Sequence, residues 1–181
     1  MRERAGTGRA QVRLAPWEPG DQDLLQRLVG DPAMMEHLGG PESPEQVAAR
    51  HERYLRAPSG IFKAVDAATG EPVGSVVFWS REWRGEDVYE IGWAVLPEHQ
   101  GRGVARAATA LGIAAAQAEG RHRFMHAFPN VDNAASNALC RRLGFELLGP
   151  VDFEYPKGST MRCNDWRLDL AAPPDGAGGA A

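Results

Sequence analysis

The chain has 181 residues, 43% of them hydrophobic, which is enough for one globular domain with a substantial core. Its formal net charge of −4 argues against general nucleic-acid binding, which usually leaves a basic surface. Cys140 and Cys163 match neither a disulfide framework nor a metal-ligand spacing, so we expect reduced thiols in a cytoplasmic protein without a metal. We expect no membrane span or secretion signal, because no apolar run approaches about 18 residues.

The N-terminal part predicts one strand followed by helices. Residues 1–11 form a polar arm that we expect to be disordered, and residues 12–15 alternate as a short strand does. Residues 21–29 place leucines on one helical face, and a cap and first-turn proline predict a short helix over residues 31–38. A capping box then predicts a helix over residues 43–55.

The rest of the chain predicts the main sheet and its covering helices. We expect a hairpin over 61–66 and 73–80, a polar crossover over 81–87, a strand over 88–96, a helix over 104–119, a strand over 123–128, a helix over 133–143, and strands over 146–153 and 165–170 separated by a long polar loop. One domain therefore spans residues 12–170, and residues 171–181, rich in Ala, Pro and Gly, form a tail that we expect to be disordered.

A glycine-spaced turn joins the strand over 88–96 to the Ala-rich helix that follows it. Gly101 and Gly103 let the backbone turn tightly and let a ligand approach it closely. A helix start suits an anion such as phosphate, and Arg102 and Arg106 add positive charge. The turn has neither the third glycine of a dinucleotide fingerprint nor the Gly-Lys-Ser/Thr of a P-loop. Taken alone, the glycines could equally serve only to shape the turn.

The neighbouring motifs resemble those of a known family. The pattern Gln100-x-x-Gly103-x-Ala105 follows the apolar strand over 90–97 and precedes Ser-Asn-Ala-Leu-Cys-Arg-Arg-Leu-Gly-Phe over 136–145. In this order and spacing the motifs resemble the GNAT superfamily of acetyl-CoA-dependent N-acetyltransferases over nearly the whole chain. The Asn133-Ala-Ala-Ser136 motif is similar to the subgroup typified by ribosomal-protein N-terminal acetyltransferases.

The resemblance implies an α+β fold with a mixed, mostly antiparallel central sheet, splayed middle strands and flanking helices. It implies acetyl-CoA as cosubstrate, with the pantetheine arm in the gap between the splayed strands and the diphosphate on the amides of the glycine turn. The implied cofactor-binding residues are Val95, Gln100, Gly101, Arg102, Gly103, Val104, Ala105, Arg106, Asn133, Ser136 and Cys140.

The implied reaction, direct attack of an amine on a thioester, needs a proton acceptor for the amine and a proton donor for the departing thiolate. Glu90 is the candidate base, acting directly or through a water. It is an acid among apolar and small residues, so we expect a partly enclosed carboxylate with a raised pKa. Its alternative role is a carboxylate merely hydrogen-bonded within the strand. Many family members place a tyrosine where this chain has Cys140, so the donor role passes to Ser136, supported by Asn133. The alternative for Ser136 and Asn133 is helix capping, and an acyl-carrying Cys140 is a third option that nothing nearby in sequence supports.

The acceptor implied by the resemblance is a primary amine of a small molecule or of a protein N-terminus. The helical segment before the sheet then borders the acceptor pocket, with ordinary packing as the alternative for its candidate lining residues Met34, Met35, His37, His51 and Tyr54. A different class of function, a non-catalytic acetyl-CoA-binding sensor or partner domain, also fits the glycine turn. The family resemblance further suggests a homodimer.

Overall fold

The computed structural model describes residues 11–171, so the expected N-terminal arm and C-terminal tail lie almost wholly outside the described residues. The strands are β1 (Val12–Pro16), β2 (Ile61–Asp66), β3 (Pro72–Trp83), β4 (Glu86–Val95), β5 (Phe124–Ala127), β6 (Glu146–Glu154) and β7 (Thr160–Asp169). The helices are α1 (Gln22–Val29), α2 (Pro44–Arg56), α3 (Val104–Glu119) and α4 (Ala134–Arg142), with short 3₁₀ turns η1 (Pro19–Asp21) and η2 (Pro97–His99).

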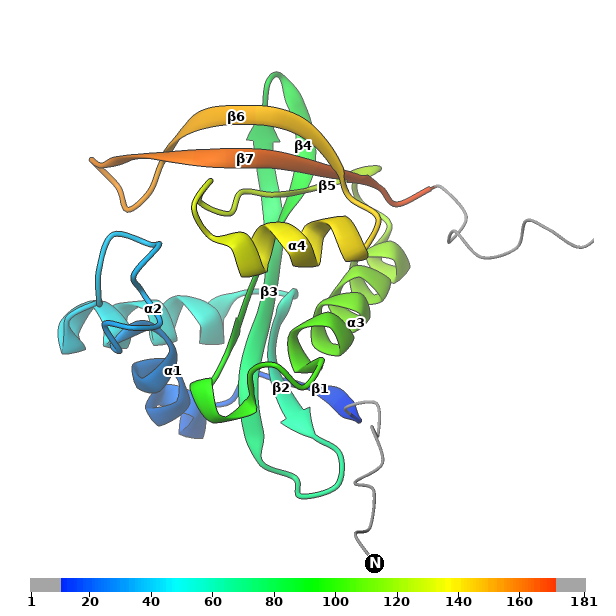
Figure 1. Cartoon of the computed structure of the whole chain (residues 1–181). Helices are drawn as coiled ribbons and strands as arrows, with labels where there is room; N and C mark the ends of the chain where they lie inside the picture. The colour runs from blue at the N-terminus through cyan, green and yellow to red at the C-terminus, as the bar shows by residue number, and fades with distance from the viewer. Residues whose placement is uncertain (1–10, 172–181) are drawn as a thin grey trace, which may run out of the picture.

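The seven strands form one sheet in the order β1-β2-β3-β4-β5-β7-β6 (Figure 1). Every neighbouring pair is antiparallel except β4 and β5, which run parallel because α3 crosses over between them. The predicted α+β class with a mixed, mostly antiparallel sheet is therefore confirmed.

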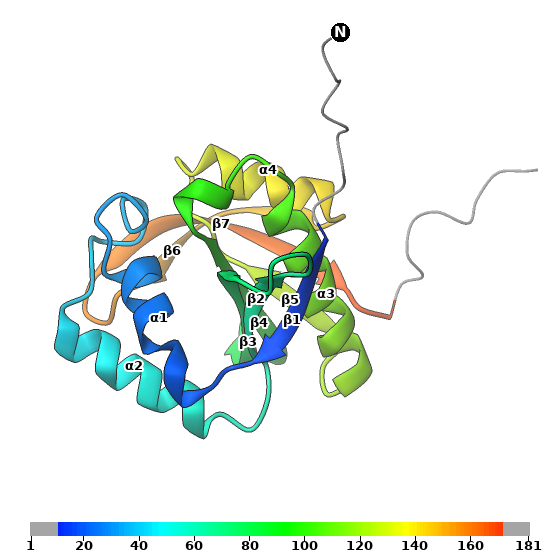
Figure 2. The same ribbon diagram turned by 90° about the horizontal axis from the view of Figure 1, so that it is seen from below.

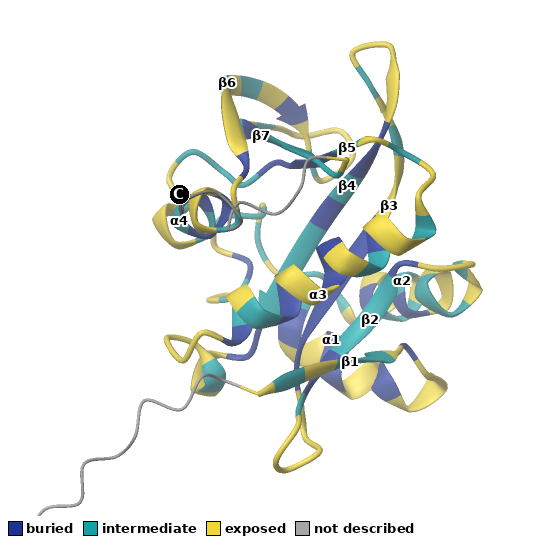
Figure 3. Cartoon of the chain, turned by 90° about the vertical axis from the view of Figure 1, so that its right-hand side faces the viewer, coloured by how far each residue is buried: buried dark blue, intermediate teal, exposed yellow. Residues whose placement is uncertain are grey.

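Helices cover both faces of the sheet. Figure 2 shows α1 and α2 on one side of β1–β4 and α3 on the other. The α3 side holds the largest core cluster, which includes Tyr89, Ile91, Ala108 and Cys140, whereas α1 and α2 pack around Leu25 and Leu96 in a second cluster. The central strands β3 and β4 are buried or half-buried along most of their length, as burial on two faces requires (Figure 3). No helix among residues 11–171 is long and apolar enough to cross a membrane.

Local signals place several helix ends as predicted. The Ser43 hydroxyl accepts a hydrogen bond from the Gln46 backbone N–H at 3.3 Å, and the Gln46 side chain accepts one from Ser43 at 2.8 Å, which is the capping box that starts α2. Gly120 and Gly144, with φ of 66° and 81°, take the left-handed conformation just after α3 and α4. These positions stop both helices where the sequence indicates.

The helix expected over residues 31–38 does not form. The Asp31 carboxylate accepts backbone hydrogen bonds from Ala33 and Met34 at 2.8 and 3.2 Å, which begins a turn. Only turns follow, and Gly39 and Gly40 then adopt φ of 85° and 96°. Turns started by the Asp31 carboxylate and closed by two glycines with positive φ therefore take the place of the helix.

Two expected loops are instead tight hairpins. The predicted crossover over 81–87 is wrong, because β3 and β4 continue through it and turn at Arg84 and Gly85, whose φ values are 52° and 81°. Two successive positive φ values suit the two-residue turn that joins twisted strands. The predicted loop over 154–164 is also shorter than expected, because β6 and β7 pair up to Glu154 and Thr160.

Candidate functional site

The middle of the sheet opens where β4 and β5 part. These strands pair at only two positions, of which the last joins Glu90 to His126. β4 continues to Val95 with β3 on its other side, whereas β5 ends at Ala127. Within residues 11–171, the edge of β4 beyond Glu90 therefore has no strand partner toward β5. Its backbone N–H and C=O groups can pair with an extended, amide-bearing ligand.

The glycine turn lies at the end of this open edge. Gly101 and Gly103 have φ of 71° and 81°, and a Cβ added to either would meet no atom within 4 Å outside its chain neighbours. Gly103 is the N-cap of α3 and Val104 anchors the first turn in the core, and the first amides of a helix have no acceptor within the helix itself. Arg102 and Arg106 are both exposed beside them. The turn combines backbone donors, the positive end of a helix and two cations, which suits a diphosphate.

Gln100 ties the turn to the end of β4. Its side-chain amide donates a hydrogen bond to the Val95 carbonyl at 2.9 Å and lies 3.6 Å from the Met34 sulfur. Ala105, one turn further, is half-buried against the main core. Gln100 thus positions the turn against the strand rather than simply pointing at solvent, and the Val95 carbonyl keeps its second lone pair for a ligand.

The N-terminus of α4 follows β5, the strand on the other side of the gap. The Asn133 carboxamide oxygen accepts a hydrogen bond from the Ser136 backbone N–H at 3.0 Å, so Asn133 does cap this helix. Ser136 is half-buried. Cys140 has no exposed surface, and burial raises the pKa of its thiol to about 12. A neutral, enclosed thiol offers neither a nucleophile nor a cofactor contact at this surface.

Glu90 is a carboxylate held at the vertex of the gap. Its side chain is only 12% exposed, and one oxygen lies 2.5 Å from an Arg81 guanidinium nitrogen. Burial raises the pKa of Glu90, while the hydrogen bond and charge of Arg81, and the charge of His126, oppose that rise. The expected raised pKa is present, and Arg81 is a partner that the sequence analysis missed. The guanidinium carbon of Arg81 lies 4.4 Å from the Phe153 ring centre.

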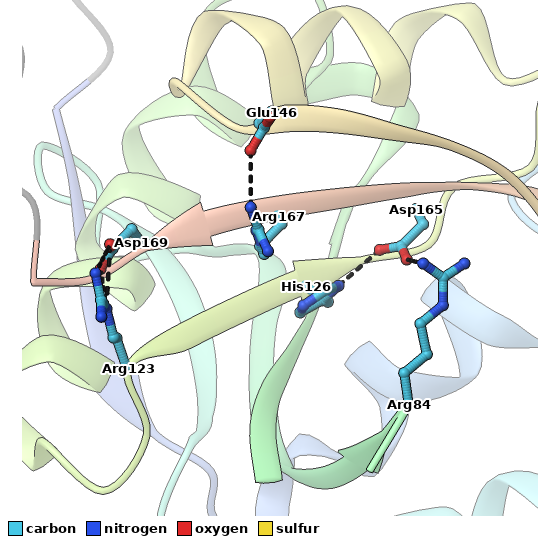
Figure 4. Close-up of polar contacts among 7 residues, drawn as sticks. All are labelled: Arg84, Arg123, His126, Glu146, Asp165, Arg167 and Asp169. Atoms are coloured by element: carbon cyan, nitrogen blue, oxygen red, sulfur yellow. Dashed lines mark hydrogen bonds and ion pairs between the residues drawn. The ribbon is translucent and has the colours of Figure 1, made fainter. Parts of the chain in front are cut away.

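A buried pair beside Glu90 also escaped the sequence analysis. His126 Nδ1 lies 2.6 Å from one oxygen of Asp165, and the Trp83 indole donates to the other oxygen at 2.9 Å. Arg84 reaches the same carboxylate at 3.8 Å (Figure 4). One signal in the sequence could have found this pair. His126 is a polar residue between apolar neighbours in β5, and strand alternation places its side chain on the sheet face that also carries Glu90.

Asn137, also missed, braces α4 against the sheet. Its side-chain amide donates to the carbonyls of Asn130 and Asn133 at 2.9 and 2.8 Å. Its oxygen accepts from Asn164 and from the Trp166 indole, each at 2.8 Å. The buried carboxamide is fully satisfied, so its role is to hold the start of α4 in place.

A cavity of about 330 Å³ lies between the turns after α1 and the hairpin of β6 and β7. Its lining residues are Glu36, His37, Gly39, Asn130, Tyr155, Ser159, Thr160, Met161 and Arg162. Of the expected acceptor-pocket residues, His37 lines this cavity. Met35 and His51 are instead buried, and the His51 ring accepts a hydrogen bond from the Trp17 indole at 3.0 Å. Tyr54 lines a second cavity, of about 270 Å³, with Trp17.

Arg50 of α2 fixes one wall of the 330 Å³ cavity. It forms an ion pair with Glu42 and donates a hydrogen bond to the Tyr155 hydroxyl at 3.0 Å. Figure 1 shows the segment between α1 and α2 rising to meet the β6–β7 turn. The arginine therefore joins the helical part of the chain to the hairpin that carries Tyr155. Among residues 11–171, no three His, Cys, Asp or Glu side chains are grouped so that they could hold a metal ion.

Residues 11–146 match the family model described as acetyltransferase (GNAT) domain. The mycothiol acetyltransferase of Pseudarthrobacter chlorophenolicus is 33% identical over 77% of this chain, which corresponds to 46% of that protein. A second mycothiol acetyltransferase, from an Arthrobacter species, is matched over 42% of its length, so the chain spans less than half of these curated relatives.

Solved structures share the fold at low sequence identity. Spermidine N-acetyltransferase from Vibrio cholerae, in complex with CoA and spermine, has a TM-score of 0.73 and 19% identity, covering 88% of this chain and 96% of that chain. Ribosomal-protein-alanine N-acetyltransferase from Brucella melitensis has a TM-score of 0.68 and 22% identity, covering 88% of this chain and 99% of that one.

Proposed function

Because the chain belongs to the acetyltransferase (GNAT) domain family, we propose that it transfers an acetyl group from acetyl-CoA directly to a primary amine. The observation that carries this proposal is the coincidence of three features: the open edge of β4, the glycine turn at its end and the largely buried carboxylate of Glu90 at its start. A thioester held along this edge would place its reacting carbon near Glu90.

The proposed cofactor site follows from the backbone. The pantetheine arm would pair with the free edge of β4 near Val95, and the diphosphate would lie on the amides of residues 101–105 between Arg102 and Arg106. Gln100 supports the turn, and Asn133 and Ser136, at the start of α4 after β5, would complete the site from the other side of the gap. Cys140 is left out of the site because it has no exposed surface. The V. cholerae enzyme of the same fold holds CoA, which supports this assignment.

The chemistry assigns one task to each polar group. Glu90 accepts a proton from the attacking amine, directly or through a water, as the C–N bond forms. A backbone N–H of β4 near Val95 stabilises the oxyanion. Ser136 donates its hydroxyl proton to the sulfur as the C–S bond breaks, and it recovers a proton from solvent. No metal takes part in this scheme.

The acceptor would enter through the 330 Å³ cavity beside His37 and Tyr155. Both a small primary amine and a protein N-terminus remain candidate acceptors, and intact mass of co-expressed ribosomal proteins tests the second.

We propose that the protein is cytoplasmic. Cys140 and Cys163 are both free thiols, and a reducing compartment keeps thiols in this state. We also propose a homodimer, which sedimentation equilibrium tests.

The decisive experiment measures thiol release from acetyl-CoA across a library of amines and peptides. With an accepted substrate, Glu90→Gln and Ser136→Ala should each slow turnover by roughly tenfold or more, in the range of lost acid–base catalysis. Glu52→Gln, which alters an exposed carboxylate on α2 paired with Arg56, serves as control and should leave turnover unchanged.

The alternative, a sensor that binds acetyl-CoA without turning it over, has a distinct signature. The sensor is favoured if acetyl-CoA binds tightly and the wild type releases thiol no faster than Glu90→Gln with every acceptor. Turnover that survives both substitutions would instead retain the enzyme and reject the two proposed residue roles.

A further inference from the structure

We propose that His126, oriented by the buried carboxylate of Asp165, is a positioning residue that keeps Glu90 ionised at the vertex of the gap. The inference rests on the proposed function for the role of Glu90 as base. It assigns a role to two buried polar side chains, on β5 and β7, that the proposed mechanism does not otherwise use.

Asp165 has the surroundings of a permanently ionised carboxylate. It is fully buried, yet its pKa is lowered, because the effect of burial is outweighed by hydrogen bonds from His126 and Trp83 and by the charges of His126 and Arg84. An ionised carboxylate only accepts hydrogen bonds, so the 2.6 Å contact requires His126 Nδ1 to be the donor. The proton on Nδ1 is thereby fixed, and Nε2 is the ring nitrogen that Asp165 does not engage.

The ring of His126 is also held in place by packing. It stacks on Phe128 with ring centres 5.8 Å apart and planes 17° from parallel. Phe128 in turn stacks on Phe153 and meets Trp83 edge to face. The hydrogen bond to Asp165 and this aromatic cluster together leave the imidazole one orientation.

That orientation places the imidazole beside Glu90. The two residues are paired in the parallel register of β4 and β5, so their side chains share one face of the sheet on strands about 4.8 Å apart. Burial raises the pKa of Glu90, and Arg81 and His126 oppose this from β3 and β5 respectively. The charge of His126 therefore acts on the carboxylate from the side of Glu90 that β5 occupies.

The other charged and titratable groups around His126 are already engaged. Arg167, its register partner on β7, forms an ion pair with Glu146 (Figure 4), and the two groups lie 3.0 Å apart. Arg84 lies on Asp165, and Cys163 of β7 stays neutral because burial and then the charge of Glu90 raise its pKa to about 11. Substitution of His126 in β5 therefore changes one charge beside Glu90, that of the imidazole.

Titration of Glu90 by carbon-13 NMR tests the inference in the free protein, without an acceptor. The Glu90 carboxyl signal is identified by its absence in Glu90→Gln. In His126→Gln, whose amide can still donate to Asp165 but never carries a charge, the pKa of Glu90 should rise by roughly half a unit or more. Asp165→Asn should shift it in the same direction, and the double variant should match His126→Gln alone, because Asp165 acts through His126.

Arg123→Met is the matched control, since it breaks an exposed ion pair with Asp169 at one end of the same two strands without touching His126 or Asp165, and the pKa of Glu90 should stay unchanged. An unchanged Glu90 pKa in folded His126→Gln, or additive shifts in the double variant, would overturn the inference. Should His126→Gln fail to fold, the isosteric Asp165→Asn decides alone by the same shift.

Kinetics separate this inference from the proposed function. With an acceptor in hand, the acidic limb of kcat should move to higher pH in His126→Gln by the shift that NMR measures, because Glu90 must be ionised to act, while KM stays unchanged. Absence of turnover in the wild type would refute the proposed function yet leave the NMR result standing. A fall in kcat at all pH values with the limb unmoved would mark a merely structural role for His126.

Discussion

Replacing Gly103 by alanine tests the proposed diphosphate site most directly. Gly103 has φ of 81° and is the N-cap of α3, with no atom within 4 Å of an added Cβ apart from its chain neighbours. The variant is therefore penalised by backbone strain rather than by a clash, and a left-handed non-glycine residue costs about 1–2 kcal/mol. If the turn relaxes to relieve this strain, its amides leave the positions that face the ligand, and a loss of that size weakens binding roughly 5- to 30-fold.

Gly70→Ala is the matched control for this measurement. Gly70 has a nearly identical φ of 78° and an equally open Cβ position, but it lies in the turn between β2 and β3. Calorimetric titration with CoA should show weaker binding only for Gly103→Ala, whereas urea unfolding should show at most a similar loss of stability for both. Wild-type CoA affinity in Gly103→Ala would refute the assignment of the diphosphate to this turn.

Two further predictions concern the parts that support the site. Arg50→Met should lower the free energy of unfolding by about 2 kcal/mol, because it leaves the largely buried carboxylate of Glu42 unpaired, while Arg56→Met, which breaks an exposed pair, should have no measurable effect in the same urea titration. Cys140 and Cys163 should resist iodoacetamide in the native protein at pH 8, since burial raises the pKa of their thiols to about 12 and about 11, and intact mass should show both labelled after denaturation. A labelled native Cys140 would contradict the closed packing of α4.

The elements that sequence predicted best are those whose ends carry their own chemical signal. The bounds of α3 follow from Gly103 and Gly120, both with positive φ, and from an apolar stripe between them. The capping box at Ser43 marks α2 in the same way. In each case a few adjacent residues determine the local backbone, so no tertiary information is needed.

What sequence could not provide is contact set by strand register. His126 and Asp165 lie 39 positions apart, and they meet because β5 and β7 pair in one particular register. Arg81 reaches Glu90 only because β3 and β4 continue past the expected strand ends. The outer end of this hairpin carries exposed charged residues, as loops do. The sequence therefore did not predict that β3 and β4 pair there.

The position of Glu90 follows from the unequal lengths of the two parallel strands. β4 is supported along its whole length by antiparallel β3, so it stays extended to Val95 without β5. β5 has four residues before the chain turns toward α4, so pairing stops beside Glu90 and the free peptide groups of β4 begin at the next residue. Gly112 lets α3 lie close to both central strands, since an added Cβ would come 2.5 Å from Val76 of β3 and 3.5 Å from Ile91 of β4. A short strand, a long strand and one close helix contact therefore align the proposed base, the free backbone edge and the glycine turn along a single line of the sheet.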